Sequence, residues 1–245
     1  MSKDTDFTGK HVLVVGGSSG IGNGIAHGFR ERGASVHVWG TRPRAADYDP
    51  TEGSDLAGLG YSCVDVSDPD AIEMAAAPFE GLDVLILCQG TVVYGGGEFE
   101  RPAWDKVMAV TLDSLMHCSR KFRGALADSQ GSIIIVSSVA GLMASNGTPA
   151  YAAAKAGAIN LTKTLGKLFA AEGIRVNGLA PGLVGTKLTK VVTDHPDRLE
   201  VALARIPKGR MGTPADMAGA AIFLASPLAS YVTGHTLNVD GGYSL

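Results

Sequence analysis

Short apolar runs of strand length alternate with longer stretches of helical periodicity along this chain of 245 residues. A run at 11–16 is followed by a helical stretch at 20–32 and a second run at 35–39. Because neighbouring parallel strands need a long crossover connection, usually a helix, this order is typical of a βαβ unit. Further strand-like runs lie at 61–64, 82–88, 132–137, 175–179 and 236–239. The alternation predicts an α/β fold, a single-domain Rossmann-type doubly wound parallel sheet of about seven strands flanked by helices.

Two segments interrupt this rhythm, but no shift in composition or long polar linker divides the chain. We therefore expect one nucleotide-binding domain over residues 1–245. Residues 41–60 contain two prolines and several glycines, so the helix expected there should be short or replaced by a loop. Residues 183–210 insert a helical stretch between a strand and the next helix. That insertion is either a plain surface hairpin of helices or, as we expect, a lid over a substrate.

Composition excludes several classes of partner. The net charge is -3 with acids and bases dispersed, so no basic stripe is present to bind nucleic acid. No apolar run approaches the roughly 18 residues that span a membrane, and the first residues lack the pattern of a secretory signal, which favours a cytoplasmic protein. Cys63, Cys88 and Cys118 lie far apart among apolar residues, and we expect reduced core thiols. The scattered histidines and cysteines predict no metal site.

A glycine-rich loop follows the first strand-like run and leads into the first helical stretch. Glycines at 16, 17, 20 and 22 let the backbone turn sharply and approach a pyrophosphate, which free N–H groups and the helix dipole would bind. The position between strand and helix makes this pattern a strong indication of a dinucleotide site. The residues expected to contact the cofactor here are Gly16, Ser18, Ser19, Gly20, Ile21 and Gly22.

The candidate catalytic residues lie near the middle of the chain. Tyr151 and Lys155 are four residues apart in a helical stretch, which puts both side chains on one helix face. A nearby ammonium, together with the positive ring of an oxidised nicotinamide, stabilises a phenolate and is expected to lower the pKa of Tyr151, making it a proton donor and acceptor. Ser138 lies just past an apolar strand-like run, at the end of the sheet where ligands of such folds bind.

The spacing of Gly16, Gly20 and Gly22, together with Tyr151 and Lys155, resembles the short-chain dehydrogenase/reductase family over the whole chain. The resemblance implies that Ser138 hydrogen-bonds the substrate oxygen, Tyr151 transfers a proton, and Lys155 holds the nicotinamide ribose. It also implies further cofactor contacts at Asp65, Val66, Gly90, Pro181, Gly182, Val184 and Thr186.

Two positions depart from the family pattern. Thr111 stands where the family has a catalytic Asn that anchors a water molecule largely through its backbone carbonyl, so Thr111 either preserves or weakens that relay. Of the family's Asn-Asn-Ala-Gly stretch, only Gly90 remains. We therefore expect the packing around the cofactor near Gly90 to differ from that in other members of the family.

The end of the second strand bears on the choice of coenzyme. NAD-binding folds of this type place an acid there for the ribose hydroxyl, whereas here Thr41 and Arg42 follow Gly40. Arg42 offers a fork of donors to a 2′-phosphate, which favours NADP(H), with NAD(H) the alternative if the arginine is only a solvated loop charge.

The expected substrate is a small uncharged alcohol or ketone. The proposed pocket rim is apolar and consists of Met143, Leu188, Val191 and Val192, beside Ser138 and Tyr151. Two other functions stay open: a 3-oxoacyl-carrier-protein reductase, which Arg120, Lys121 and Arg123 keep possible, and a regulator that senses NADP without turnover. The resemblance also implies a homo-oligomer, a tetramer with a dimer as the alternative, with subunit contacts through residues 107–123 and 151–171 and the C-terminal run.

Overall fold

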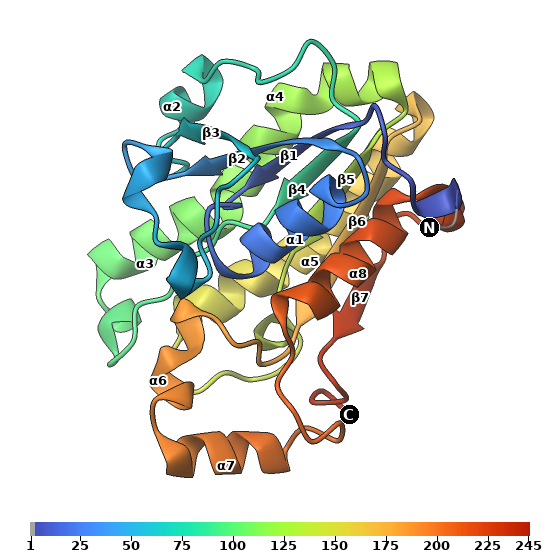
Figure 1. The fold of residues 1–245 in the computed structure, drawn as a ribbon. Coiled ribbons are helices and arrows are strands. Elements are labelled where there is room, and N and C mark those ends of the chain that lie inside the picture. The colour runs from blue at the N-terminus through green and yellow to red at the C-terminus, as the bar shows by residue number, and fades with distance from the viewer. Residues whose placement is uncertain (1–2) are drawn as a thin grey trace.

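The computed structural model describes residues 3–245, and within them seven parallel strands form one sheet (Figure 1). The strand order is β3-β2-β1-β4-β5-β6-β7. The strands are β1 (His11–Val15), β2 (Ser35–Gly40), β3 (Gly60–Cys63), β4 (Val84–Leu87), β5 (Ser132–Val136), β6 (Arg175–Pro181) and β7 (Thr236–Val239). The predicted fold class is confirmed, and each strand-like run of the sequence is a strand.

Helices cover both faces of this sheet (Figure 1). They are α1 (Gly20–Arg30), α2 (Pro69–Met74), α3 (Arg101–Met108), α4 (Ser114–Ser129), α5 (Pro149–Phe169), α6 (Lys190–Thr193), α7 (Pro196–Ala204) and α8 (Pro214–Ala225). Alternate residues of β1 point to opposite faces: Val12 and Val14 pack with α1 and α8, and Leu13 and Val15 pack with α4 and α5. Burial on both faces explains why the strands are continuously apolar in sequence.

The strand order creates the crevice in which a ligand of such a sheet binds. The chain runs outward from β1 through β2 to β3 and then returns to place β4 on the other side of β1. Connections after β1 and β4 therefore leave in opposite directions and open a gap at the carboxyl ends of these strands.

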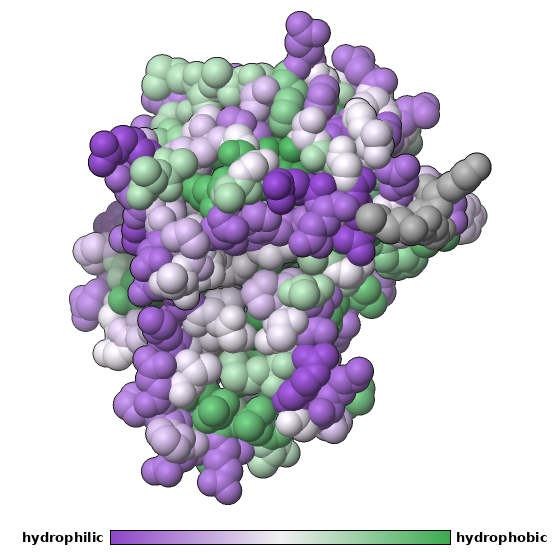
Figure 2. All heavy atoms as spheres, viewed as in Figure 1, coloured by the Kyte–Doolittle hydropathy of each residue, from purple (hydrophilic) through white to green (hydrophobic). Residues whose placement is uncertain are grey.

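The two segments that interrupt the sequence pattern also depart from regular βα units. Between β2 and β3 two short 3-10 turns, Ala45–Asp47 and Pro50–Glu52, replace a crossover helix, as predicted. Residues 183–210 contain the 3-10 turn Lys187–Thr189 followed by α6 and α7, which lie beyond the carboxyl end of the sheet at the bottom of Figure 1. Figure 2 shows apolar side chains gathered on the surface in this region.

The three cysteines are all free thiols, but they do not share one environment. Cys118 is buried and Cys88 is partly buried, whereas Cys63 is exposed. The prediction that Cys63 lies in the core is wrong, because it ends β3 and β3 is an edge strand with a partner on one side only.

Over residues 3–245, none of the helices has the length and apolar content needed to span a membrane. The same residues contain no cluster of His, Cys, Asp and Glu that could hold a metal ion.

Candidate active site

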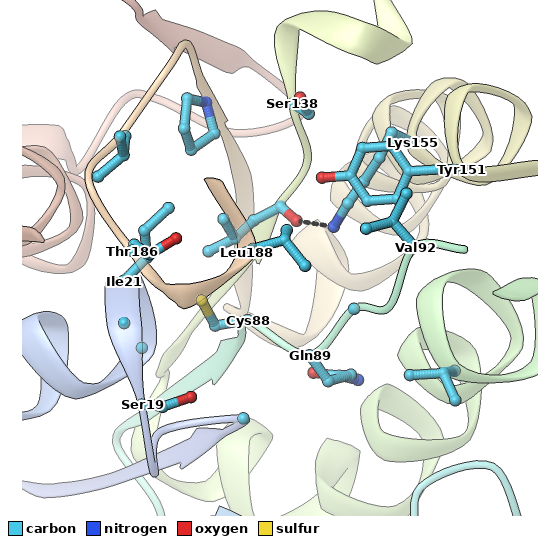
Figure 3. A pocket seen from close by; sticks show the side chains of 18 of the residues that line it. Ser19, Ile21, Cys88, Gln89, Val92, Ser138, Tyr151, Lys155, Thr186 and Leu188 are labelled. Atoms are coloured by element: carbon cyan, nitrogen blue, oxygen red, sulfur yellow. Dashed lines mark hydrogen bonds between the residues drawn. The ribbon is translucent and has the colours of Figure 1, made fainter. Parts of the chain in front are cut away.

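A cavity of about 580 Å³ opens at the carboxyl ends of the central strands (Figure 3). It extends from Trp39 at the end of β2 and Thr41 just after it, past the glycine-rich loop, to Tyr151 and Lys155 on α5. The predicted site residues that line it are Gly16, Ser18, Ser19, Gly20, Ile21, Gly22, Thr41, Val66, Gly90, Ser138, Tyr151, Lys155, Pro181, Gly182, Val184, Thr186 and Leu188. Segments far apart in sequence thus form one continuous lining.

The glycine-rich loop packs too tightly for side chains. Gly16 has a φ of 74°, and a Cβ there would lie 2.8 Å from the Cα of Gln89. A Cβ on Gly22 would collide with the carbonyl oxygen of Gly16. The loop therefore brings bare backbone and the N-terminus of α1 to the cavity wall, where N–H groups favour an anion.

Ser138, Tyr151 and Lys155 meet at the opposite end of the cavity (Figure 3). Lys155 is 3% exposed, and its Nζ donates a 2.7 Å hydrogen bond to the carbonyl oxygen of Val136 on β5. The same Nζ lies 5.6 Å from the ring centroid of Tyr151. Ser138 follows β5 and accepts a 3.1 Å hydrogen bond from the N–H of Ala140, which fixes the position of its hydroxyl.

Burial dominates the electrostatics of this group. It raises the pKa of Tyr151 to about 12, although interaction with the Ser138 side chain acts in the opposite direction. It also lowers the pKa of Lys155 to about 8. The sequence predicts a pKa of Tyr151 that Lys155 and an oxidised nicotinamide lower together, whereas in this chain by itself burial raises that pKa.

Thr111 lies behind the cavity wall. It is fully buried in a π-helical segment, Ala109–Asp113, between α3 and α4. Its Oγ1 accepts a 3.2 Å hydrogen bond from the N–H of Thr91 and lies 3.4 Å from the Thr91 carbonyl oxygen. Thr91 follows Gly90, so Thr111 supports the strand end that lines the cavity and is not itself part of the lining.

At the β2 end of the cavity, the charged groups point away from the lining. Arg42 is exposed, donates to the carbonyl oxygen of Asp47 and stacks 4.9 Å over the ring of Tyr48. The Tyr48 hydroxyl accepts from the N–H groups of Thr41 and Arg42 at 3.0 and 3.1 Å. Asp65 is also exposed and accepts hydrogen bonds from Ser67, while its neighbours in sequence line the cavity.

More loops line the substrate end of the cavity than the sequence predicted. Leu188 lines the cavity, but Met143, Val191 and Val192 do not. The last two lie on α6, which packs against α7. Additional lining residues from the loops after β4 and β5 are Val92, Tyr94, Ser145, Asn146 and Thr148.

The comparisons with known proteins agree with this arrangement. A family model described as enoyl-(acyl carrier protein) reductase matches residues 15–244. The chain is 38% identical to the 3-oxoacyl-[acyl-carrier-protein] reductase FabG of Chlamydia muridarum, over 95% of this chain and 96% of that protein. The chain belongs to the short-chain dehydrogenase/reductase family.

Other members of the family are similar over their full length. A 2-dehydro-3-deoxy-D-gluconate 5-dehydrogenase of Pseudoalteromonas atlantica is 37% identical, with 99% of both chains covered. The solved structure of the NADP active-site complex of Pseudomonas aeruginosa RhlG is 32% identical, covers 100% of both chains and superposes with a TM-score of 0.92. This chain is accordingly a short-chain NAD(P)-dependent dehydrogenase/reductase that acts on CH–OH or C=O groups.

The cavity suits the dinucleotide that this family uses. Bare glycine backbone lines its middle, and a buried lysine with spare N–H donors stands at one end. Sequence reasoning did not find Tyr48, Tyr94 or Lys187, which also border the site. These residues lie in loops or, for Lys187, in a short 3-10 turn, where no periodicity or short motif marks a side chain that approaches a ligand.

Proposed function

We propose that the protein is an NADP(H)-preferring oxidoreductase that moves a hydride between a nicotinamide and a small secondary alcohol or ketone. The observation that carries this proposal is the meeting of Ser138, Tyr151 and Lys155 on one wall of the cavity that the glycine-rich loop also lines. A protein that only senses NADP has no physical need for a proton donor beside the cofactor.

The residues divide the chemistry between them. A bound nicotinamide coenzyme supplies the hydride for reduction of the carbonyl carbon, or accepts it in the reverse direction. Ser138 donates a hydrogen bond to the substrate oxygen and orients it. Tyr151 donates its hydroxyl proton to that oxygen during reduction and takes it back during oxidation. Lys155 binds the ribose with the donors that Val136 does not use, and its charge stabilises the phenolate of Tyr151.

Thr111 is proposed to act on this group indirectly. Its side chain is used for hydrogen bonds with Thr91, so any contribution to a water relay beside Lys155 comes from its backbone carbonyl. The π-helical turn supports this assignment, because such turns often lie at functional sites.

A test of the catalytic group uses NADPH, a panel of ketones and absorbance of the nicotinamide. We expect Tyr151→Phe to lower kcat at least about 1,000-fold while coenzyme affinity stays within about twofold, since only the proton donor is lost. Lys155→Ala should lower both kcat and the affinity for the coenzyme. Near-native turnover by Tyr151→Phe on any accepted substrate would overturn the mechanism, and absence of turnover by the wild type on every substrate would favour the regulator.

The preference for NADP(H) is proposed from the loop after β2. No carboxylate occupies Gly40 or Thr41, and the exposed Arg42 directly follows Thr41, which lines the cavity. The RhlG structure, whose ligand is NADP, supports the same choice.

Binding titrations with NADPH and NADH test this preference. We expect NADPH to bind more tightly, and Arg42→Ala to reduce the preference about tenfold, the size of one charge-assisted contact of about 1.4 kcal/mol. Arg44→Ala is the control, because Arg44 is also exposed but forms an ion pair with Asp47. Equal affinity for both coenzymes, or an Arg42→Ala protein with unchanged preference, would contradict the assignment.

A second candidate, reduction of 3-oxoacyl groups on a carrier protein, is favoured by the FabG relatives. Docking an acidic carrier needs unpaired basic residues. On α4, however, Arg120 pairs with Glu73, and Arg123 pairs with Glu172. Within residues 3–245 Lys121 has no carboxylate partner and donates to the backbone carbonyl oxygen of Glu73, so it alone of the three keeps an unpaired charge. We therefore keep the small substrate as the first proposal. Assays with a 3-oxoacyl carrier protein and with small ketones separate the two functions. A carrier-protein reductase should have the lower KM for the carrier-bound substrate.

A further inference from the structure

Glu98 is a fully buried carboxylate whose role the proposed chemistry does not explain. It lies in the 3-10 turn Gly97–Phe99 and is 0% exposed. One of its oxygens accepts from the N–H of Val93 and the other from the N–H of Tyr151, each at 3.0 Å. Within residues 3–245 no cation lies in ion-pair contact with it. A buried charge held only by two backbone donors is costly, so its position needs a reason.

The bond to Tyr151 places Glu98 at the start of α5. Tyr151 is the third residue of that helix, and N–H groups of a first turn have no partner within the helix. Thr148 stands at the N-cap but its side chain makes no capping bond. Glu98 thus caps α5 from a different segment, and the positive end of the 21-residue helix stabilises its charge.

The bond to Val93 connects the same carboxylate to the substrate side of the cavity. Val93 is flanked by Val92 and Tyr94, both of which line the cavity. The Tyr94 hydroxyl donates a 3.1 Å hydrogen bond to the carbonyl oxygen of Leu188, in the inserted segment. The Glu98 side chain therefore joins the backbone of Tyr151, the proposed proton donor, to the loop that contacts Leu188 through Tyr94.

We propose that Glu98 is a positioning residue for Tyr151: its carboxylate fixes the first turn of α5 against the loop that borders the substrate, so that the phenol and the substrate pocket keep one relative geometry. This inference rests on the proposed role of Tyr151. A capping serine or threonine on α5 itself could not take this role. Such a residue could bond an N–H group of the first turn, but it would not reach the N–H of Val93.

The charge of Glu98 gives the proposal a measurable signature. Groups that face Tyr151 are Ser138 after β5, Lys155 on α5, Cys88 after β4, and Tyr94 and Glu98 from the following loop. Burial is the main cause of the raised pKa of Tyr151, and Ser138 opposes it. Tyr94, Cys88 and Glu98 raise that pKa further, since negative charge near a phenolate disfavours it.

The experiment compares Glu98→Gln with Glu100→Gln in the protein loaded with oxidised coenzyme. Glu100 is exposed, two residues away and equal in charge, which makes it a matched control. The ionisation of Tyr151 is followed by ultraviolet tyrosinate absorbance, as the difference from Tyr151→Phe under the same conditions. We expect the midpoint to fall by about 1 pH unit in Glu98→Gln, because a negative charge near the phenolate is removed. Glu100→Gln should titrate like the wild type.

A second variant separates position from charge. Glu98→Asp keeps the carboxylate but is one methylene too short to reach both N–H groups, so its midpoint should stay near that of the wild type while kcat falls about tenfold. If Glu98→Gln does not fold, Glu98→Asp alone decides, because unchanged kcat overturns the positioning role. An unchanged midpoint in Glu98→Gln also overturns it. The titration reads Tyr151 without a substrate, so it stands even if Tyr151→Phe remains active and the proposed function fails.

Discussion

At the scale of single residues, the burial of Lys155 in the site is unfavourable for folding. Lys155 is enclosed by the cavity wall with one hydrogen bond to Val136, and burial lowers its pKa to about 8. An ammonium in this position costs folding free energy that an apolar side chain would not. In the proposed mechanism the same charge is needed beside the phenol of Tyr151, which accounts for a lysine at this position.

Replacement of Lys155 by Met should therefore stabilise the coenzyme-free protein by about 1 to 3 kcal/mol while it abolishes turnover. Because the folded-state pKa is lowered, the folded protein binds fewer protons than the unfolded chain between about pH 8 and the ordinary value of 10.5. The wild type should gain stability relative to Lys155→Met as the pH rises through this window. Denaturant titrations at several pH values measure this, with exposed Lys163→Met on the same helix as control. A pH-independent difference would contradict it.

At the scale of elements, three contacts tie the segment after β6 to neighbouring loops. Lys187 forms a 2.8 Å ion pair with Glu52 and lies 3.3 Å from the hydroxyl of Ser54, both in the connection between β2 and β3. Tyr94, in the loop after β4, donates to the carbonyl oxygen of Leu188. The segment that we propose as a lid is thus tied to two separate loops.

Glu52→Gln should loosen the proposed lid without damaging the fold. An exposed ion pair contributes little to stability, so we expect coenzyme dissociation to accelerate only about two- to fivefold with little loss of stability. Stopped-flow release of NADPH and thermal melts measure both quantities. Glu73→Gln breaks the comparable ion pair with Arg120 on α4 and should leave dissociation unchanged. Equal release rates in all three proteins would show that the lid is not held by Lys187.

At the scale of the whole molecule, apolar side chains remain on faces that one chain does not cover. Met116 on α4 is 42% exposed and Leu168 on α5 is 59% exposed. These helices contain the segments that the family resemblance assigns to subunit contacts. Leu245 at the end of the chain is also fully exposed. The predicted homo-oligomer would cover such residues and bury apolar surface that is otherwise in water.

Light scattering at micromolar concentration should therefore give a mass of about four chains of 25.2 kDa, or two if only one interface forms. Leu168→Lys should reduce that mass, since a charge at the centre of an apolar interface is costly. Val201→Lys on α7 is the matched control, because Val201 is 65% exposed but lies outside those helices. A monomeric wild type would refute the prediction.

The sequence alone determined those features that depend on local pattern. Continuous apolar runs of strand length and helical stretches of 3.6-residue period are local features, so the seven strands and their parallel pairing could be predicted. The glycine-rich loop was visible because it must lie between a strand and a helix. Tyr151 and Lys155 were found because a spacing of four residues fixes one helix face.

Tertiary structure decided everything that depends on segments far apart in the chain. Glu98 is 53 residues from Tyr151, and Tyr94 is 94 residues from Leu188, so no local spacing could pair them. The raised pKa of Tyr151 is of the same kind, because burial is its largest cause and burial depends on segments far apart in the chain. Local sequence fixes which elements form and which side chains they present, whereas burial and loop contacts are collective properties that exist only once the chain has folded.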